Sequence, residues 1–286
     1  MTNSWPSSRP SSTTSSPGSS TGSAGFDRTG LSPSSPSSAA APSTSGPQPS
    51  SSTTAAASTS APSTTTSSNL SERIRYNDRL LILGRSGSGK STLARALFLA
   101  AAAPRLVIDP ADSELTAIPG AVTFHDGRRI PWADGATLRF VPRHADDRAG
   151  YDALYRGILA HGRVYVWLDE PEDAAPATGY PKAGKSVVVR GRKLWIGHQT
   201  CATEPVNIAV HLKRNADHVF GFDLPLEDDR RHIARAIGVP LEVVEAAQAA
   251  LEPFGFWWFD RRARELTICP PIGPALLDDG PDDADA

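Results

Sequence analysis

The stretch Gly84–Ser91, with the sequence GRSGSGKS, constrains the fold of this 286-residue chain more than any other feature. It has the spacing GxxxxGK[ST], and it lies between a short apolar run, Arg79–Leu83, and an Ala- and Leu-rich stretch, Lys90–Ala102. Glycines let such a loop fold back with its N–H groups pointing inward, and the amino end of a following helix adds its positive dipole end. The sequence therefore predicts a strand, a phosphate-binding loop and a helix, in that order.

Nine residues of this loop and of the helix start are the candidates for holding a nucleoside triphosphate. The loop backbone would surround the phosphates, the Lys90 ammonium would reach the β- and γ-phosphates, and the Ser91 hydroxyl would bind Mg²⁺. The candidates are Gly84, Arg85, Ser86, Gly87, Ser88, Gly89, Lys90, Ser91 and Thr92. A Gly- and Ser-rich turn that fits the spacing by chance is the alternative, and the flanking strand and helix patterns argue against it.

A pair of carboxylates, Asp169 and Glu170, follows a strongly apolar run, Val164–Leu168. Asp169 is expected to hold Mg²⁺ together with Ser91, and Glu170 is expected to polarise an attacking water as a general base. An acidic pair that only caps a turn is the alternative. Because a glutamate beside the magnesium aspartate activates water, the pair favours hydrolysis of ATP over transfer of its phosphate to a metabolite.

Apolar runs alternate with amphipathic stretches from Asn77 onward, which predicts an α/β fold with a parallel sheet covered by helices on both faces. Further helices are expected at Asp147–His161, 227–237 and 241–251. Further strands are expected at Arg105–Ile108, Val122–Phe124, Thr137–Val141, Val164–Leu168, Leu194–Ile196 and His218–Phe222, with a closing hairpin at Phe254–Asp260 and Glu265–Cys269.

The closing hairpin carries an aromatic run, Phe254–Phe259. Alternation along a strand predicts that one face is buried, so Trp257 and Trp258 are not expected both to point inward. An aromatic surface that stacks on bases or meets a neighbouring subunit is the alternative. The insert 171–184, with Lys182 and the nearby Lys185, is either a flexible surface loop or a loop that contacts a DNA backbone.

Composition divides the chain into three parts. Residues 1–69 are Ser, Thr, Pro or Ala at about four positions in five, and such a segment is expected to be a disordered tether that could recruit a protein partner. Residues 70–276 are expected to form one ATPase-sized domain, and residues 277–286 an acidic disordered tail.

Charge and cysteine content argue against a strongly basic DNA-binding domain, a disulfide-rich protein and a cysteine-based metal site. The net charge is −2, and residues 70–276 carry 27 basic and 25 acidic residues, so DNA contact would need a local patch or a pore formed by an oligomer. Cys201 and Cys269 have no metal-site or disulfide spacing. No segment predicts membrane insertion or secretion, and a cytoplasmic location is expected.

The segment Gly191–Thr200, with the sequence GRKLWIGHQT, resembles the corresponding segment of the FtsK–HerA superfamily of P-loop (RecA-like, ASCE) ATPases, in which a strand after the acidic pair ends in glutamine. The downstream residues Asn215, Ala216 and Asp217 resemble the continuation of that pattern. The resemblance spans about Arg79–Gly238. It implies that Gln199 senses the γ-phosphate and that Arg192 stabilises the transition state from a neighbouring subunit.

The same resemblance implies a homo-oligomer, usually a hexameric ring, that hydrolyses ATP with Mg²⁺ at its subunit interfaces and translocates or packages double-stranded DNA. No segment of these 286 residues resembles the additional domains of the larger members, so a minimal motor recruited by a partner is expected. A nucleotide-switched assembly or scaffold ATPase that does not pump DNA is the alternative function.

Overall fold

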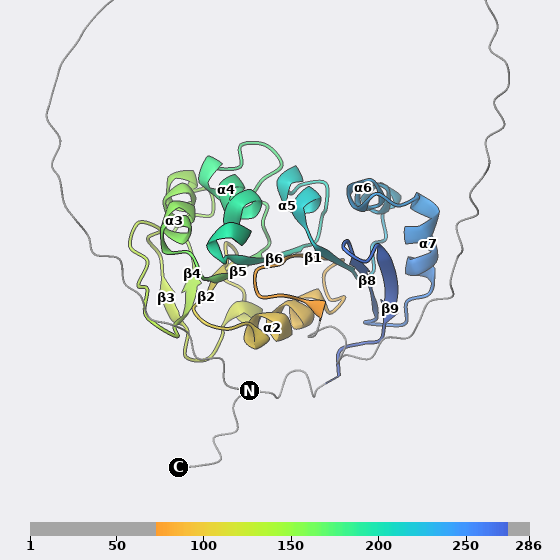
Figure 1. Cartoon of the computed structure of the whole chain (residues 1–286), viewed down its shortest axis with the longest axis horizontal. Coiled ribbons are helices and arrows are strands. Elements are labelled where there is room, and N and C mark those ends of the chain that lie inside the picture. The colour runs from red at the N-terminus through yellow and green to blue at the C-terminus, as the bar shows by residue number, and fades with distance from the viewer. Residues whose placement is uncertain (1–72, 274–286) are drawn as a thin grey trace, which may run out of the picture. The chain divides into compact units, whose positions relative to one another are not determined.

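The structure, a computed structural model, describes residues 73–273, which form a nine-stranded sheet covered by helices (Figure 1). The strands are β1 (Arg79–Leu83), β2 (Arg105–Ile108), β3 (Val122–Phe124), β4 (Thr137–Phe140), β5 (Tyr165–Asp169), β6 (Gly197–Ala202), β7 (His218–Gly221), β8 (Phe256–Asp260) and β9 (Glu265–Cys269). The α-helices are α2 (Lys90–Ala100), α3 (Arg148–His161), α4 (Lys182–Arg190), α5 (Val210–Asn215), α6 (Glu227–Ile237) and α7 (Leu241–Ala249), with 3₁₀ helices η1 (Glu114–Thr116) and η2 (Gly191–Leu194). The expected α/β fold class is confirmed. The expected tails, 1–69 and 277–286, lie outside the described residues, and the division into three parts stays a prediction.

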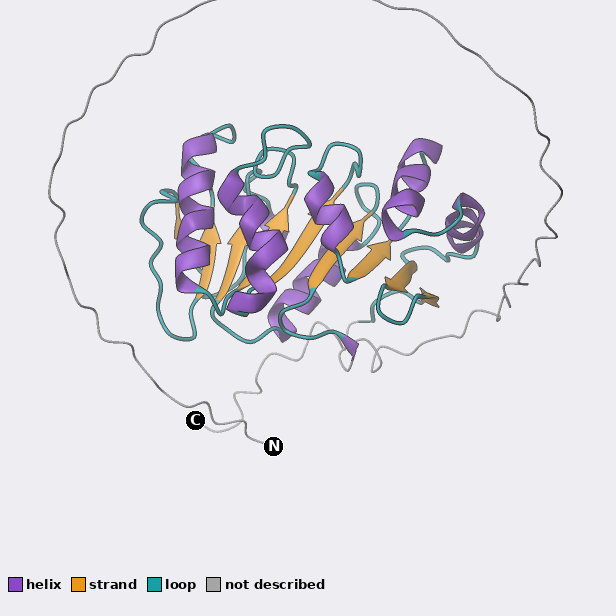
Figure 2. Cartoon of the chain, turned by 45° about the horizontal axis from the view of Figure 1, so that its top comes forward, coloured by secondary structure: helices purple, strands orange, loops and turns teal. Residues whose placement is uncertain are grey.

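The strand order is β3-β4-β2-β5-β6-β1-β7-β8-β9. All pairs from β3 to β7 are parallel, whereas the β8–β9 hairpin joins the same sheet in antiparallel fashion next to β7. The parallel strands therefore end at one edge of the sheet, to which their arrows point in Figure 2. This edge, here called the carboxyl edge, receives the loops after β1, β5 and β6, and ligands of open α/β sheets bind there.

The two faces of the sheet are covered unequally. Helices α3, α4, α5, α6 and α7 pack on one face of the sheet, and helix α2 packs on the opposite face (Figure 1). Helix α3 buries Tyr151, Leu154, Tyr155 and Ile158, as their spacing predicts. The insert after Glu170 is more ordered than a flexible loop, because Lys182 and Lys185 lie on α4 and Ala174, Ala175 and Tyr180 are buried.

The prediction of a strand at Leu194–Ile196 is wrong. Leu194 closes η2, and Trp195 follows it in the left-handed region with φ of 57°. Both residues are exposed, at 40% and 49%, so Leu194 and Trp195 lie in a turn on the surface, whereas Ile196 is buried. The strand starts at Gly197 instead and continues to Ala202.

Trp257 and Trp258 alternate along β8 as expected, but the expectation that only one face of this strand is buried is wrong. They point to opposite faces of β8, and each is 0% exposed. Trp257 belongs to the core on the α7 side, and Trp258 belongs to the core on the α2 side, which Ile74, Tyr76 and Ile272 help to cover. Both faces of β8 are thus covered, a condition that strand alternation alone does not reveal.

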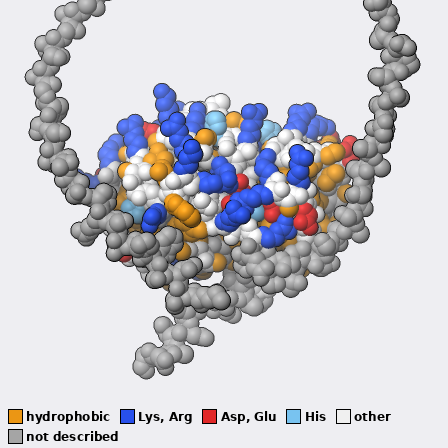
Figure 3. All heavy atoms as spheres, viewed as in Figure 1, with side chains coloured by type: hydrophobic (Ala, Val, Ile, Leu, Met, Phe, Trp, Pro, Cys, Tyr) orange, Lys and Arg blue, Asp and Glu red, His pale blue; other side chains and the backbone are white. Residues whose placement is uncertain are grey.

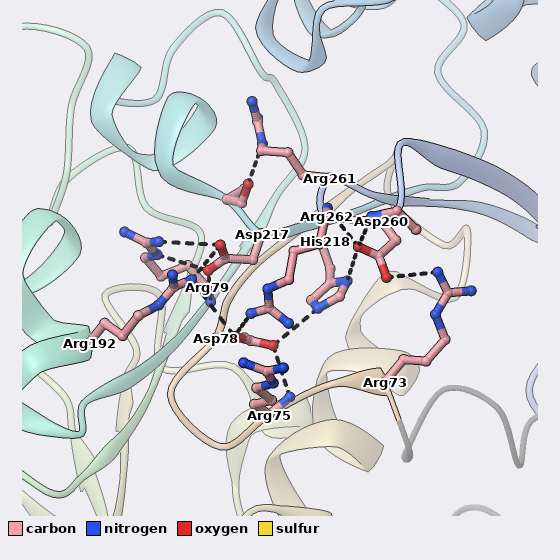
Figure 4. A network of polar contacts seen from close by, with 12 residues as sticks. Arg73, Arg75, Asp78, Arg79, Arg192, Asp217, His218, Asp260, Arg261 and Arg262 are labelled. Carbon is pink, nitrogen blue, oxygen red and sulfur yellow. Dashed lines mark hydrogen bonds and ion pairs between the residues drawn. The ribbon is translucent and has the colours of Figure 1, made fainter.

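A network of ion pairs ties together the amino ends of β1, β7 and the hairpin (Figure 4). The buried carboxylate of Asp78 accepts hydrogen bonds from His218 Nε2 at 3.2 Å, from the Arg75 N–H at 2.9 Å and from Arg262. Burial by itself raises the pKa of Asp78, but these hydrogen bonds outweigh it and lower the pKa to about 2. The network lies at the edge of the sheet opposite the phosphate-binding loop.

Within residues 73–273, no helix has both the length and the apolar character that a membrane span requires.

Candidate nucleotide-binding site

The loop between β1 and α2 has the backbone that a phosphate-binding loop needs. Gly89 precedes the first residue of α2 with φ of 100°, a conformation that glycine adopts without strain. A Cβ atom at Gly84 would lie 2.6 Å from Phe222 Cβ and 2.7 Å from Ser88 Oγ, so only glycine fits there. The Arg85 N–H donates to the Asp223 carbonyl at 2.9 Å, and the Arg85 side chain pairs with the Asp223 carboxylate. These contacts fix the loop against the segment after β7.

Lys90 and Ser91 begin helix α2, whose first turn carries no acidic side chain. The positive end of the helix dipole is therefore not neutralised by its own residues. Lys90 is 6% exposed, and the buried Ser88 hydroxyl has no hydrogen-bond partner among the described residues. Such donors at a helix start suit an anion.

Asp169 and Ser91 both lie near the Cys201 side chain, because each of them affects the pKa of its thiol. Burial, together with the charges of Asp109 and Glu170, raises the pKa of Asp169 to about 7, although the Lys90 charge opposes this rise. Parallel pairing of β5 with β6 sets this arrangement, because Asp169 is in register with Cys201. The hydroxyl and the carboxylate that the sequence assigned to Mg²⁺ are thus close together at the carboxyl edge.

Glu170 leaves β5 in an uncommon backbone conformation. Its φ is 40°, and its N–H donates to the Cys201 carbonyl at 3.0 Å. Left-handed backbone is costly for a residue other than glycine, and such strain concentrates at functional sites. The turn takes the exposed Glu170 side chain out of the strand direction, next to the buried Asp169.

Gln199 was expected at the end of a strand, but the structure places it in the middle of one. Gln199 is the third of six residues of β6 and is 0% exposed. Its Oε1 accepts from the Tyr165 hydroxyl at 3.0 Å, and its Nε2 donates to the Ala94 carbonyl at 2.7 Å. Both ends of the amide are engaged under α2, so in this arrangement Gln199 braces the helix rather than facing the loop.

Arg192 also lies away from the phosphate-binding loop of its own chain. It belongs to η2 at the amino end of β6, and its guanidinium pairs with Asp217 at 2.5 Å (Figure 4). Action on a neighbouring subunit's nucleotide would require release of this pair. That role stays a prediction.

Sequence reasoning missed three residues near the loop. Thr203 follows the last residue of β6, which is in register with Leu83 at the end of β1, so Thr203 holds the strand-end position expected for Gln199. Cys201 lies near both Ser91 and Asp169, and Phe222 packs against Gly84 and Gly89. The first two could have been found from the correct start of β6, whereas the contact of Phe222 depends on the pairing of β7 with β1.

Comparison with known proteins places the fold. No protein-family model matches the chain, and no curated protein matches its sequence. Among solved structures, the genome packaging NTPase B204 from Sulfolobus turreted icosahedral virus 2 in complex with AMP is similar, with a TM-score of 0.58 and 18% identity over 70% of this chain and 100% of that chain. Its complex with ATP-gammaS gives a TM-score of 0.57 and 17% identity over the same shares.

The crystal structure of B204, the DNA-packaging ATPase from Sulfolobus Turreted Icosahedral Virus, gives a TM-score of 0.54 and 18% identity over 68% of this chain and 98% of that chain. At this identity the likeness establishes the fold, which is that of a P-loop NTPase. The fold that the FtsK–HerA resemblance implied is therefore confirmed.

Proposed function

We propose that this chain is a Mg²⁺-dependent ATPase that works as an oligomeric motor on double-stranded DNA. One observation carries the ATPase part: the helix start with Lys90 and Ser91 meets the strand end with Asp169 and Glu170 at a single edge of the sheet. The nucleotide complexes of B204 support it at the level of fold.

The residues present fit Mg²⁺. The Ser91 hydroxyl and the Asp169 carboxylate are hard oxygen ligands, and both lie near the Cys201 side chain at the carboxyl edge. Mg²⁺ commonly takes one or two protein oxygens, with phosphate and water oxygens as its remaining ligands. When bound, it supplies positive charge that offsets the charge on the phosphates.

The chain's own groups account for the remaining chemistry. Lys90 and the N–H groups of Gly84–Ser91 bind and orient the phosphates. Glu170, held next to Asp169 by its turn, accepts a proton from the water that attacks the γ-phosphorus. We expect Glu170→Gln to bind ATP with unchanged affinity and to release phosphate at least about a hundredfold more slowly than the wild type, within the usual range for general bases. Equal turnover of the two proteins would overturn this assignment.

The DNA part of the proposal is supported by the distribution of charge. One surface, here called the amino-edge face, consists of the residues at the amino ends of strands β5, β6, β1 and β7 and in the β8–β9 turn. It holds eleven basic and four acidic side chains, in residue 163 and ranges 73–79, 190–193, 214–217 and 260–265. Three of its four carboxylates, Asp78, Asp217 and Asp260, are buried beneath arginines.

The outer layer of this face is therefore positive. Figure 3 shows Lys and Arg side chains spread over the side of the molecule turned to the viewer, with few acidic ones between them. Adjacent strands lie about 4.8 Å apart, so the basic residues of five neighbouring strands form a row about 20 Å long. Such a row matches a polymer of phosphates better than a small anion, and it explains how a nearly neutral chain can bind DNA.

Charge reversal tests this surface. Arg190 and Lys193 are exposed and take part in none of the ion pairs of the network, so Arg190→Glu/Lys193→Glu should fold normally. We expect it to bind a labelled duplex more weakly and with a smaller salt dependence, by about one released counterion per residue. Arg128→Glu/Arg129→Glu, exposed after β3, is the control with the same change in charge. Equal losses in both variants would remove the amino-edge face from the proposal.

Assembly into a ring is the part that rests on the family resemblance. Sedimentation of Glu170→Gln with ATP, with and without duplex DNA, tests it directly. A closed oligomer is expected, while a monomer under both conditions would favour a nucleotide-switched scaffold protein over a pump.

A further inference from the structure

A hollow of about 320 Å³ adjoins the phosphate-binding loop on the side of the closing hairpin. Arg85, Gly87 and Ser88 line it from the loop, and the segment Leu251–Gly255 between α7 and β8 lines it from the other side. Its volume lies in the range of small-molecule pockets. A ligand whose phosphates lie on the loop would have the rest of its structure beside this hollow.

Phe254 is the exposed aromatic side chain of this hollow. It is 63% exposed and has φ of 63°, so the chain holds a large apolar residue in the left-handed region and in contact with water. Its ring is near the loop, because a Cβ atom at Gly89 would lie 3.8 Å from Phe254 Cδ1. Neither exposure nor backbone conformation is explained by packing in the core.

A buried aromatic pair lies beside the same loop. Phe222 and Phe256 have ring centroids 5.2 Å apart, and both side chains are 1% exposed. A Cβ atom at Gly89 would lie 3.3 Å from Phe222 Cε1, so Phe222 and Phe254 approach the loop at the same glycine.

Five polar side chains line the hollow, and the protein engages those of Arg85, Asp223 and Gln248, whereas those of Ser88 and Glu252 have no partner among the described residues. Gln248 accepts from the Leu224 N–H at 3.0 Å and donates to the Phe222 carbonyl at 2.7 Å. Arg85 pairs with Asp223. The hollow thus offers an aromatic face and few oriented hydrogen-bonding groups, which suits a flat ring more than a sugar or a peptide.

We propose that the hollow binds the base of the nucleotide, and that Phe254 stacks on that base. The inference rests on the proposed function, because it takes the phosphates to lie on Gly84–Ser91. Stacking tolerates any base, since each has a π-face, and both amide ends of Gln248 are occupied. Stacking on Phe254 therefore selects nucleotides by their aromatic ring and does not by itself distinguish adenine from guanine.

Calorimetric titration of the full chain with ATP, GTP and inorganic tripolyphosphate, each with Mg²⁺, tests this assignment. Phe254→Ala should weaken ATP and GTP by about five- to a hundredfold and leave tripolyphosphate unchanged. Phe254→Gly should bind as weakly as the alanine variant while unfolding no more readily than the wild type, because glycine adopts this φ without strain. Leu226→Ala, at a side chain that is 61% exposed, is the matched control.

ATP affinity of Phe254→Ala within twofold of the wild type would overturn the stacking proposal alone. Equal weakening of tripolyphosphate would overturn it too, since Phe254 would then act through the loop. Failure of the wild type to bind tripolyphosphate or ATP would instead overturn the phosphate site, and the base site with it.

Discussion

The two adjacent tryptophans of β8 allow one sharp test of the fold. Trp257→Phe and Trp258→Phe remove the same ring volume from two fully buried positions. The cavity should cost each variant about 1 kcal/mol of the free energy of unfolding. What differs is the indole N–H: Trp258 Nε1 donates to His218 Nδ1 at 3.3 Å, whereas Trp257 Nε1 has no partner among the described residues.

The consequence at Trp258 extends to the ion-pair network. His218 Nδ1 accepts this bond and Nε2 donates to Asp78, so removal of the indole N–H leaves a buried acceptor unpaired. That loss adds about 1–3 kcal/mol, whereas Trp257→Phe deletes a polar atom that was already unsatisfied. We expect Trp258→Phe to lose about 2–4 kcal/mol and Trp257→Phe about 1 kcal/mol or less.

Urea unfolding followed by far-ultraviolet circular dichroism gives both values without relying on tryptophan fluorescence. Equal slopes of the unfolding free energy against urea concentration would show that the variants expose the same surface when they unfold. A loss at Trp257 equal to or larger than the loss at Trp258 would refute the reasoning from the His218 hydrogen bond.

Three further predictions concern single residues. Because the pKa of Asp78 is lowered from 3.8 to about 2, its stabilising effect is complete above about pH 4 and disappears as the pH falls toward 2. Asp78→Asn should therefore lower the free energy of unfolding by about 2 kcal/mol at pH 7. In urea titrations between pH 2 and 5, the stability of this variant should depend less on pH than that of the wild type. Gln199→Met should lower the free energy of unfolding by about 1–3 kcal/mol, because it unpairs the Tyr165 hydroxyl. A hundredfold lower ATP turnover per folded molecule would contradict this purely structural role and favour a role for Gln199 in sensing the γ-phosphate. Lys90→Ala should abolish measurable ATP binding in calorimetry without altering the melting temperature of the free protein, and retained affinity would contradict its phosphate contact.

The sequence was sufficient for features that local patterns encode. The loop Gly84–Ser91, the run before Asp169 and the spacing of Tyr151, Leu154, Tyr155 and Ile158 each depend on a few neighbouring residues. Binary patterning and turn chemistry act at that range. The α/β fold class and the approach of Lys90 to Asp169 follow from them.

Features that depend on partners far along the chain were not accessible in the same way. Leu194 and Trp195 look like a strand until the structure shows them exposed, and this shift of three residues moved Gln199 from a strand end to a strand middle. Trp258 is buried because the segment with Ile74 and Tyr76 covers it from a distance of more than 180 residues. The position of Phe254 beside Gly89 of the phosphate-binding loop could not be predicted, because the two residues are far apart in the sequence.

ATP turnover of the full chain with and without duplex DNA tests the central claim most directly, when the wild type is compared with Arg190→Glu/Lys193→Glu. The wild type should hydrolyse ATP with Mg²⁺ and turn over faster when DNA is added. The double variant should keep the basal rate, because its changes lie at the edge of the sheet opposite Lys90 and Glu170, and it should lose the stimulation. A wild type without ATP turnover, or with turnover indifferent to DNA, would contradict the account of a DNA motor.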